Sequence, residues 1–230
     1  MTNLIITPVY KSYEIVREMC EAIDKYTVNP YLHVLVDDDS DCGEFPVKSS
    51  PSRRIIVLKR DYTGIIHKNG GGQAMQLAFD YGHQAYCNEK LNSLPYDNLF
   101  LIEADVIVKE EWDKKMIEVK ETLPEDWATL DCQSVDLEGK LTHPTTISPR
   151  IGFIREDLEH MKYCDFQCSL FNQEIFKSGI KFSDASSHFD IIWSGKITEA
   201  TGKQHYRTMN VKVLHYFYQS RQYLNEIPRE

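Results

Sequence analysis

The stretch NLFLIEADVIV, residues 98–108, has the pattern of a buried strand that carries two carboxylates, Glu103 and Asp105. Side chains alternate faces along a strand, so these two are expected to face the same space, about 7 Å apart along the chain. An unpaired carboxylate in an apolar interior is costly unless its pKa rises until the group is neutral. We therefore expect a cation, a hydrogen-bond network, or a strand end that opens into a cleft.

The first half of the chain alternates strand and helix patterns. Residues 4–9 and the start of YLHVLVDDDS are apolar strand patterns, separated by a helical pattern with Ser12 at its N-cap position. A third apolar run, residues 55–58, precedes HKNGGGQAMQLAFDYG, in which glycines lead into a helix. After residue 108, a helical pattern ends at Pro124. This β/α order predicts a mainly parallel sheet covered by helices.

The second half has a different pattern. WATLDCQSV, ISPRIGFI, DFQCSLFN and NVKVLHYF are strand patterns, and a helix is expected from Phe189 to near Gly202. In the last strand pattern, His215 shares a face with Val211, Val213 and Phe217. We interpret the chain as one α/β domain whose open sheet gains mixed strands in its C-terminal half.

Composition narrows the class of protein. The 230 residues, 42% of them hydrophobic, can bury a substantial core. The formal charge of −9 argues against general affinity for nucleic acids or anionic membranes. The sequence has neither a signal-peptide pattern nor an apolar run long enough to span a membrane. Six cysteines without a CxxC pair fit reduced thiols, so a soluble, cytoplasmic protein is expected.

Polar residues follow three of the expected strands. The first ends in TPVY, the second in DDDS and the fourth in EAD. Ligands of open α/β sheets bind outside the carboxyl ends of the strands, so these ends are expected to line one cleft. An aromatic ring, a carboxylate for a base or ribose, and an acidic pair for a cation together suit a nucleoside diphosphate with Mg²⁺ or Mn²⁺.

These motifs resemble a known family. IITPVYKS, HVLVDDDS, the glycine-rich start of a helix and LIEADV occur in the order found in nucleotide-sugar glycosyltransferases of the GT-A fold, especially the inverting family-2 group. CSLFNQEIFKSGIKFSD and the strand with His215 are similar to that group's acceptor side. The resemblance spans about Leu4 to Tyr218. It implies a single GT-A-like domain, residues 1–230, with a Rossmann-like sheet, a nucleotide-sugar half at about 1–108 and an acceptor and catalytic half at about 109–230.

The resemblance also implies roles for residues that bind the donor. Pro8 and Tyr10 match the segment that contacts the nucleoside, and Asp38 matches the acid that binds uracil or another base. Lys68 lies near the position where a basic residue meets the diphosphate.

Further roles follow for the metal and the base. Glu103 and Asp105 stand at the family's Asp-x-Asp motif, which makes Asp105 the candidate metal ligand and Glu103 a candidate for ribose or water-mediated contact. His215 resembles a histidine that completes the metal or diphosphate site, and packing of a core histidine explains it equally well. The family's base opens an acceptor-side helix, where this chain has FSDASSHFDIIW. Asp190 best matches the base, with His188 and Asp184 as alternatives.

The expected function is therefore metal-dependent transfer of a sugar from a nucleotide-diphosphate donor, with UDP-sugars favoured, to a glycan or other hydroxyl acceptor, in glycan biosynthesis. Transfer would invert the anomeric configuration by direct displacement. A non-catalytic nucleotide-sugar or glycan-binding module of the same fold is the alternative, and turnover separates the two. A sugar-1-phosphate nucleotidylyltransferase would carry a glycine-rich basic loop after its first strand, where this chain has TPVYKS. An NAD-dependent oxidoreductase is disfavoured because the glycines follow the third strand.

Overall fold

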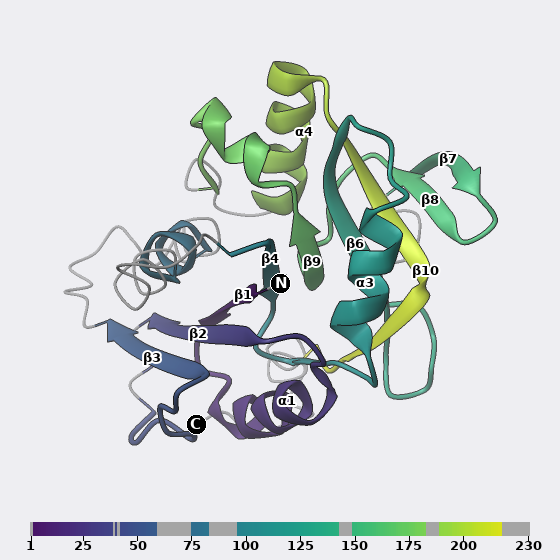
Figure 1. The fold of residues 1–230 in the computed structure, drawn as a ribbon. Helices are drawn as coiled ribbons and strands as arrows, with labels where there is room; N and C mark the ends of the chain where they lie inside the picture. Colours follow the sequence, from purple (N-terminus) through teal and green to yellow (C-terminus); the bar gives the residue numbers. More distant parts are fainter. Residues whose placement is uncertain are drawn as a thin grey trace.

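A mixed sheet with helices packed against it forms the centre of the molecule (Figure 1). The computed structural model describes residues 2–38, 40, 42–58, 75–82, 96–142, 149–182 and 189–217. The strands are β1 (Asn3–Val9), β2 (Tyr31–Asp38), β3 (Arg53–Leu58), β4 (Asn98–Ile102), β5 (Val106–Ile107), β6 (Trp127–Val135), β7 (Arg150–Arg155), β8 (Leu158–Met161), β9 (Cys168–Phe171) and β10 (Gln204–His215). The helices are α1 (Tyr13–Tyr26), α3 (Trp112–Lys120), α4 (Phe189–Thr201) and the 3-10 helix η2 (Gln173–Ser178), and residues 75–82 are also helical.

The N-terminal half is the parallel part of the sheet. In the strand order β3-β2-β1-β4-β9-β6-β10-β8-β7, the first four strands pair in parallel. β1 lies between β2 and β4, so the carboxyl ends of these three strands meet at one edge of the sheet. The parallel β/α arrangement expected from the sequence is confirmed.

The C-terminal half is mixed, as expected. β9 pairs antiparallel with both β4 and β6, while β10 is parallel to β6 and antiparallel to β8. β7 and β8 form an antiparallel pair, and β8 was not predicted from the sequence. This change of direction lets β10, the last strand, reach the carboxyl edge of β4 through the short strand β5.

Alternation along the strands separates two cores, one on each face of the sheet. Ile5 and Phe100 pack with α1 and α3 on one face, and the Phe100 and Trp112 ring centroids lie 4.9 Å apart. Leu4 and Leu99 pack on the other face with helical residues 75–82, η2 and α4. Figure 1 shows α4 and η2 together on that side, and α3 against β6 and β10. The helices therefore cover both faces and leave the strand ends to build the site.

The stretch 98–108 is not one continuous strand, so the prediction of strand alternation through Glu103 and Asp105 was wrong. β4 ends at Ile102, and residues 103–105 form a turn in which Val106 N donates to Glu103 O over 3.1 Å. The turn moves the two carboxylates out of the fully buried strand. The chain then pairs with β10 through β5.

Two smaller details also differ from the sequence prediction. Ser12 stands at the N-cap position of α1, but its hydroxyl donates to Tyr10 O and does not cap the helix. α3 ends at Lys120, ahead of Pro124, and a turn fills the interval.

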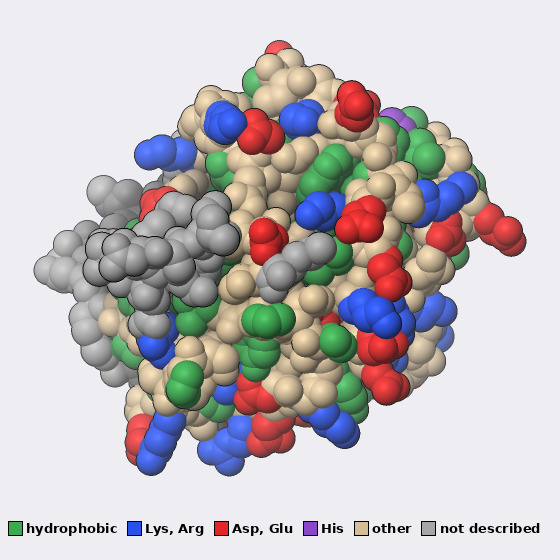
Figure 2. Space-filling view, in the orientation of Figure 1, with side chains coloured by type: hydrophobic (Ala, Val, Ile, Leu, Met, Phe, Trp, Pro, Cys, Tyr) green, Lys and Arg blue, Asp and Glu red, His purple; other side chains and the backbone are tan. Residues whose placement is uncertain are grey.

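The surface carries charges of both signs. On the face that Figure 2 shows, Lys and Arg side chains lie among Asp and Glu side chains and do not gather in one basic patch. Within the described part of the chain, no helix is long and apolar enough to cross a membrane.

Candidate functional site

Three side chains that the sequence singled out come together at the carboxyl edge of the parallel strands. Glu103 and Asp105 lie in the turn after β4, and His215 is the last residue of β10. One ligand atom from each lies within 4.8 Å of the others. His215 Nε2 is 3.4 Å from Asp105 Oδ1 and 3.7 Å from Glu103 Oε2. The imidazole is buried and both carboxylates are partly exposed, so an ion has access to the carboxylate oxygens.

Backbone pairing holds this carboxylate–histidine cluster, Glu103, Asp105 and His215, in place. His215 is opposite Val106 in the antiparallel pair of β5 and β10, and Tyr216 N donates to Asp105 O over 3.0 Å. The Phe217 ring lies against the imidazole, with the ring centroids 4.0 Å apart. The histidine is therefore fixed by the sheet independently of its contacts with the carboxylates.

Burial and the charges of neighbouring groups shift the pKa values of Glu103 and His215. Burial raises the pKa of Glu103 to about 8; the nearby His215 opposes the rise, and the charges of Asp105 and Asp190 add to it. For His215, burial alone lowers the pKa, but the hydrogen bond to Asp105 and the charges of Asp105 and Glu103 outweigh it, so the pKa is raised. A divalent cation would take the place of protons held by these groups. A set of carboxylates with one imidazole fits Mn²⁺ better than Mg²⁺, which favours oxygen ligands.

The carboxyl ends of β1 and β2 lie side by side at the same edge. Val9 is opposite Asp37 in the parallel pair. Asp37 is fully buried and accepts hydrogen bonds from the Tyr13 hydroxyl (2.9 Å) and from Ser40. Burial, together with Asp37, raises the pKa of Tyr13, so this phenol stays a donor. Asp37 thus links Ser40 and the first residue of α1 to the end of β2.

The residues matched to nucleoside contacts lie at these strand ends. Pro8 and Tyr10 are partly exposed at the end of β1, where Lys11 Nζ lies 5.4 Å from the Tyr10 ring centroid. Asp38 is the last residue of β2 and is buried. Because β1 lies between β2 and β4, these residues and the carboxylate–histidine cluster belong to one edge of the sheet.

The candidate base approaches from the other half of the chain. Asp190 is in the first turn of α4, and its charge contributes to the raised pKa of Glu103. Hydrogen bonds connect the start of α4 with residues 164–167, whose Gln167 O accepts from Glu103 N over 3.0 Å. Lys68, Asp184 and His188 lie outside the described residues.

Sequence reasoning missed two further carboxylates, Asp131 and Asp165. Both are buried, and the charge of Asp165 raises the pKa of both Glu103 and His215. Asp131 interrupts the apolar strand pattern WATLDCQSV, which is the same signal that marked Glu103 and Asp105. That signal alone would have identified Asp131 as a residue to examine.

A cavity of about 680 Å³ lies elsewhere, between helical residues 75–82 and η2. Its lining includes Phe79, Phe176 and Lys181, and none of the carboxylate–histidine cluster. The chemistry of the side chains and not this cavity therefore identifies the candidate site.

Comparison with known proteins gives matches in structure and none in sequence. Neither a protein-family model nor a curated protein sequence matches the chain. The structure of S. aureus TarS 1–349 with UDP matches at a TM-score of 0.59 and 12% identity, covering 91% of this chain and 60% of that one. The same protein with UDP-GlcNAc matches at 0.61 and 12%, covering 93% and 58%. GalNAc-T7 with UDP, GalNAc and Mn²⁺ matches at 0.63 and 12%, covering 94% and 44%.

At this identity, the likeness concerns the fold. The chain shares with these structures a mixed α/β domain of GT-A type, a central sheet flanked by helices, and the fold expected from the sequence is confirmed. The chain spans about 60% of the length of TarS 1–349.

Proposed function

We propose that this chain is a metal-dependent glycosyltransferase that moves a sugar from a UDP-sugar to an acceptor hydroxyl. The observation that carries the proposal is the approach of Glu103, Asp105 and His215 within 4.8 Å at the carboxyl edge of the parallel strands. Proteins of the same fold have been solved with UDP, with UDP-GlcNAc, and with UDP, GalNAc and Mn²⁺, which supports a nucleotide-sugar donor.

The N-terminal half, about residues 1–108, would bind the donor. Pro8 and Tyr10 would contact the nucleoside, and the Asp38 carboxylate would accept hydrogen bonds from the uracil. All three lie at the carboxyl ends of β1 and β2, on the same edge of the sheet as the carboxylate–histidine cluster.

The carboxylate–histidine cluster would hold the metal and orient the ribose. Asp105 and His215 are the proposed ligands, and Glu103 would contact the ribose or a water molecule. A divalent ion bound here supplies positive charge that offsets the charge developing on the leaving diphosphate. Because β10 contributes His215, the C-terminal half also takes part in this site.

The acceptor would be activated by Asp190. Its carboxylate takes the proton of an acceptor hydroxyl while the hydroxyl oxygen bonds to the anomeric carbon and the bond to the diphosphate oxygen breaks. A single displacement from the opposite face inverts the anomeric configuration. The position of Asp190 at the start of α4, within electrostatic reach of Glu103, supports this role.

Thermal stabilisation by a panel of UDP-, GDP- and CMP-sugars, each with Mn²⁺, Mg²⁺ or EDTA, tests the proposal. At about 100 times Kd, a ligand adds about 2.7 kcal/mol of stability. For a chain of this size that corresponds to roughly 5–10 °C in Tm. We expect a UDP-sugar with Mn²⁺ to give this shift, EDTA to remove it, and UDP to be released over time. Binding without release would favour a non-catalytic module, and no shift with any donor would overturn the proposal.

A further inference from the structure

One short segment, residues 164–167, contacts both halves of the candidate site. At one end, Glu103 N donates to Gln167 O over 3.0 Å. At the other, Cys164 N donates to Ser194 Oγ over 3.0 Å, and Ser194 Oγ donates to Asp190 O over 2.6 Å. The segment therefore links the turn that carries the carboxylates to the helix turn that carries the candidate base.

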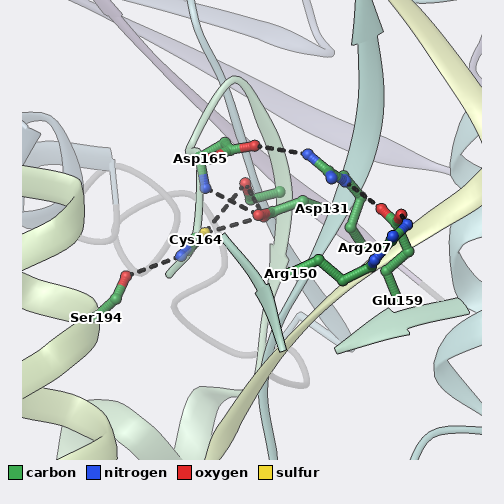
Figure 3. Close-up of polar contacts among 8 residues, drawn as sticks. Asp131, Arg150, Glu159, Cys164, Asp165, Ser194 and Arg207 are labelled. Atoms are coloured by element: carbon green, nitrogen blue, oxygen red, sulfur yellow. Dashed lines mark hydrogen bonds and ion pairs between the residues drawn. The ribbon is translucent and has the colours of Figure 1, made fainter. Parts of the chain in front are cut away.

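Hydrogen bonds to Asp131 of β6 hold this segment in place (Figure 3). Its Oδ1 accepts from Cys164 Sγ over 2.9 Å and from Ser169 Oγ over 2.6 Å, and its Oδ2 accepts from Asp165 N over 2.9 Å. The side chain is 2% exposed, and these protein donors replace part of the solvation that it loses, although burial still raises its pKa. Three contacts converge on one carboxylate.

Ion pairs to Arg207 of β10 also hold the same segment in place. Figure 3 shows the Asp165 carboxylate directed at Arg207, 3.3 Å away, and Arg207 Nε donates to Glu159 over 2.8 Å. Asp165, Arg207 and Glu159 are all buried. Arg150 also pairs with Glu159, over 2.9 Å. A buried network with its partners satisfied tends to be rigid.

The backbone of the segment is held in a conformation that it would not adopt alone. Phe166 has a φ of 60° and is fully buried, with its ring centroid 5.2 Å from that of Trp193 and 5.8 Å from that of Phe189. Left-handed backbone at a non-glycine residue costs about 1–3 kcal/mol, so the surrounding contacts must maintain it. Trp193 and Phe189 belong to α4, which carries Asp190, and Phe171 and Phe182 also pack against the Phe166 ring.

We propose that Asp131 is a positioning residue, which fixes residues 164–167 and thereby sets the position of Asp190 relative to Glu103. This inference rests on the proposed function, because it assigns Asp190 and Glu103 to one reaction. Asp131 is buried, so it would act through this segment and not by contact with donor or acceptor. Its effect is expected on the rate of the chemical step and not on donor binding, since misplacement of a reacting group by about 1 Å can cost on the order of 100-fold.

Asp131→Asn is the test variant. The amide keeps the shape of the carboxylate but offers one acceptor oxygen in place of two, so it cannot accept from Asp165 N and from the Cys164 and Ser169 side chains as Asp131 does. The rate of UDP release is measured with saturating UDP-GlcNAc and Mn²⁺, or with the UDP-sugar of the panel that stabilises the protein most. The Kd for UDP with Mn²⁺ is measured separately.

Asp113→Asn is the matched control. Asp113 is a fully buried carboxylate that accepts from Asn3 Nδ2 (3.0 Å), Val28 N (2.9 Å) and Asn29 N (3.0 Å). Asn3 begins β1, so these contacts lie at the amino edge of the strands, opposite the candidate site. This variant reproduces the loss of buried hydrogen bonds without touching residues 164–167.

We expect Asp131→Asn to lower the UDP-release rate about 10- to 100-fold while the Kd for UDP stays within about twofold, and Asp113→Asn to leave both unchanged whatever its Tm. Ser194→Ala, which removes only the link to α4, should lower the rate in the same direction, and it carries the test if Asp131→Asn does not fold. Three results would overturn this inference and leave the proposed function standing. They are an unchanged UDP-release rate in the variant that folds, an equal loss of rate in Asp113→Asn, and a loss of UDP binding that parallels the loss of rate. No UDP release by the unmodified protein would overturn the proposed function with it.

Discussion

The imidazole of His215 lies 3.4 Å from the carboxylate of Asp105, and main-chain pairing holds the two residues together. Tyr216 N donates to Asp105 O, and His215 is opposite Val106 in the pair of β5 and β10. Because these contacts involve only backbone atoms, conservative side-chain substitutions in the carboxylate–histidine cluster should leave the turn and the strand in place. The cluster can therefore be tested by mutation without losing the fold.

Asp105→Asn should abolish the Mn²⁺-dependent part of stabilisation by UDP, whereas Glu103→Gln should keep part of it. Asp105 is the proposed ligand, and loss of a direct ligand should exceed the roughly 10- to 100-fold cost of an outer-shell change. Glu103, with a pKa of about 8, is largely protonated at neutral pH without metal, so glutamine resembles it. Thermal shifts with UDP and either Mn²⁺ or EDTA measure the difference. Equal metal dependence in Asp105→Asn and the unmodified protein would return the acidic pair to a structural role.

Asp190→Ala should keep UDP and Mn²⁺ binding but lower turnover about 10²- to 10⁴-fold, the usual contribution of a general base. The first turn of α4 should persist, because Ser194 bonds to the backbone carbonyl of Asp190 and not to its carboxylate. Asp184→Ala and His188→Ala serve as controls and should retain turnover. UDP release from the donor, measured beside UDP affinity, separates binding from chemistry. Full turnover in Asp190→Ala would remove this residue as the base.

Much of the fold could be predicted from local patterns. Apolar runs alternating with helical faces predict the parallel half, and the burial of Val211, Val213 and His215 confirms the predicted face of β10. β8 escaped prediction because Glu159 and His160 interrupt its apolar pattern, and it exists through pairing with β10 and β7. Such long-range pairing leaves little trace in a local stretch of sequence.

The site could be predicted where it depends on local sequence, and not where it depends on long-range pairing. Glu103 and Asp105 stand out as carboxylates in an apolar run, and His215 is brought to them by strand pairing. The break after Ile102 depends on the pairing of β5 with β10, which lies far along the chain. The left-handed conformation of Phe166 depends on aromatic rings of other elements, so the segment around it was read as a strand from the sequence.

Mn²⁺ affinity should rise with pH between about 6 and 8. The pKa of Glu103 is raised to about 8 and that of His215 is raised above 6.5, so both groups tend to hold protons. A metal bound to His215 must displace the proton of the imidazole, and its positive charge would also lower the pKa of the neighbouring Glu103. For each proton released on binding, the Mn²⁺ affinity increases by as much as about tenfold per pH unit. Titration calorimetry in two buffers of different ionisation enthalpy counts the protons. Glu103→Gln should release fewer, and binding with no proton release near pH 7 would contradict the charges assigned to the carboxylate–histidine cluster.

His205 should make the protein less stable in acid. Burial lowers its pKa from 6.5 to about 4, although the hydrogen bond to Ser194 O opposes the shift. Between these pH values the unfolded chain binds the proton and the folded chain does not, so the stability present above pH 6.5 is lost as the pH falls to 4, by about 3 kcal/mol. His205→Gln can still donate to that carbonyl and does not titrate. In urea unfolding, the stability advantage of the unmodified protein over His205→Gln should therefore shrink by about this amount from pH 7 to 4. A difference that stays constant with pH would show that His205 is not the group that titrates.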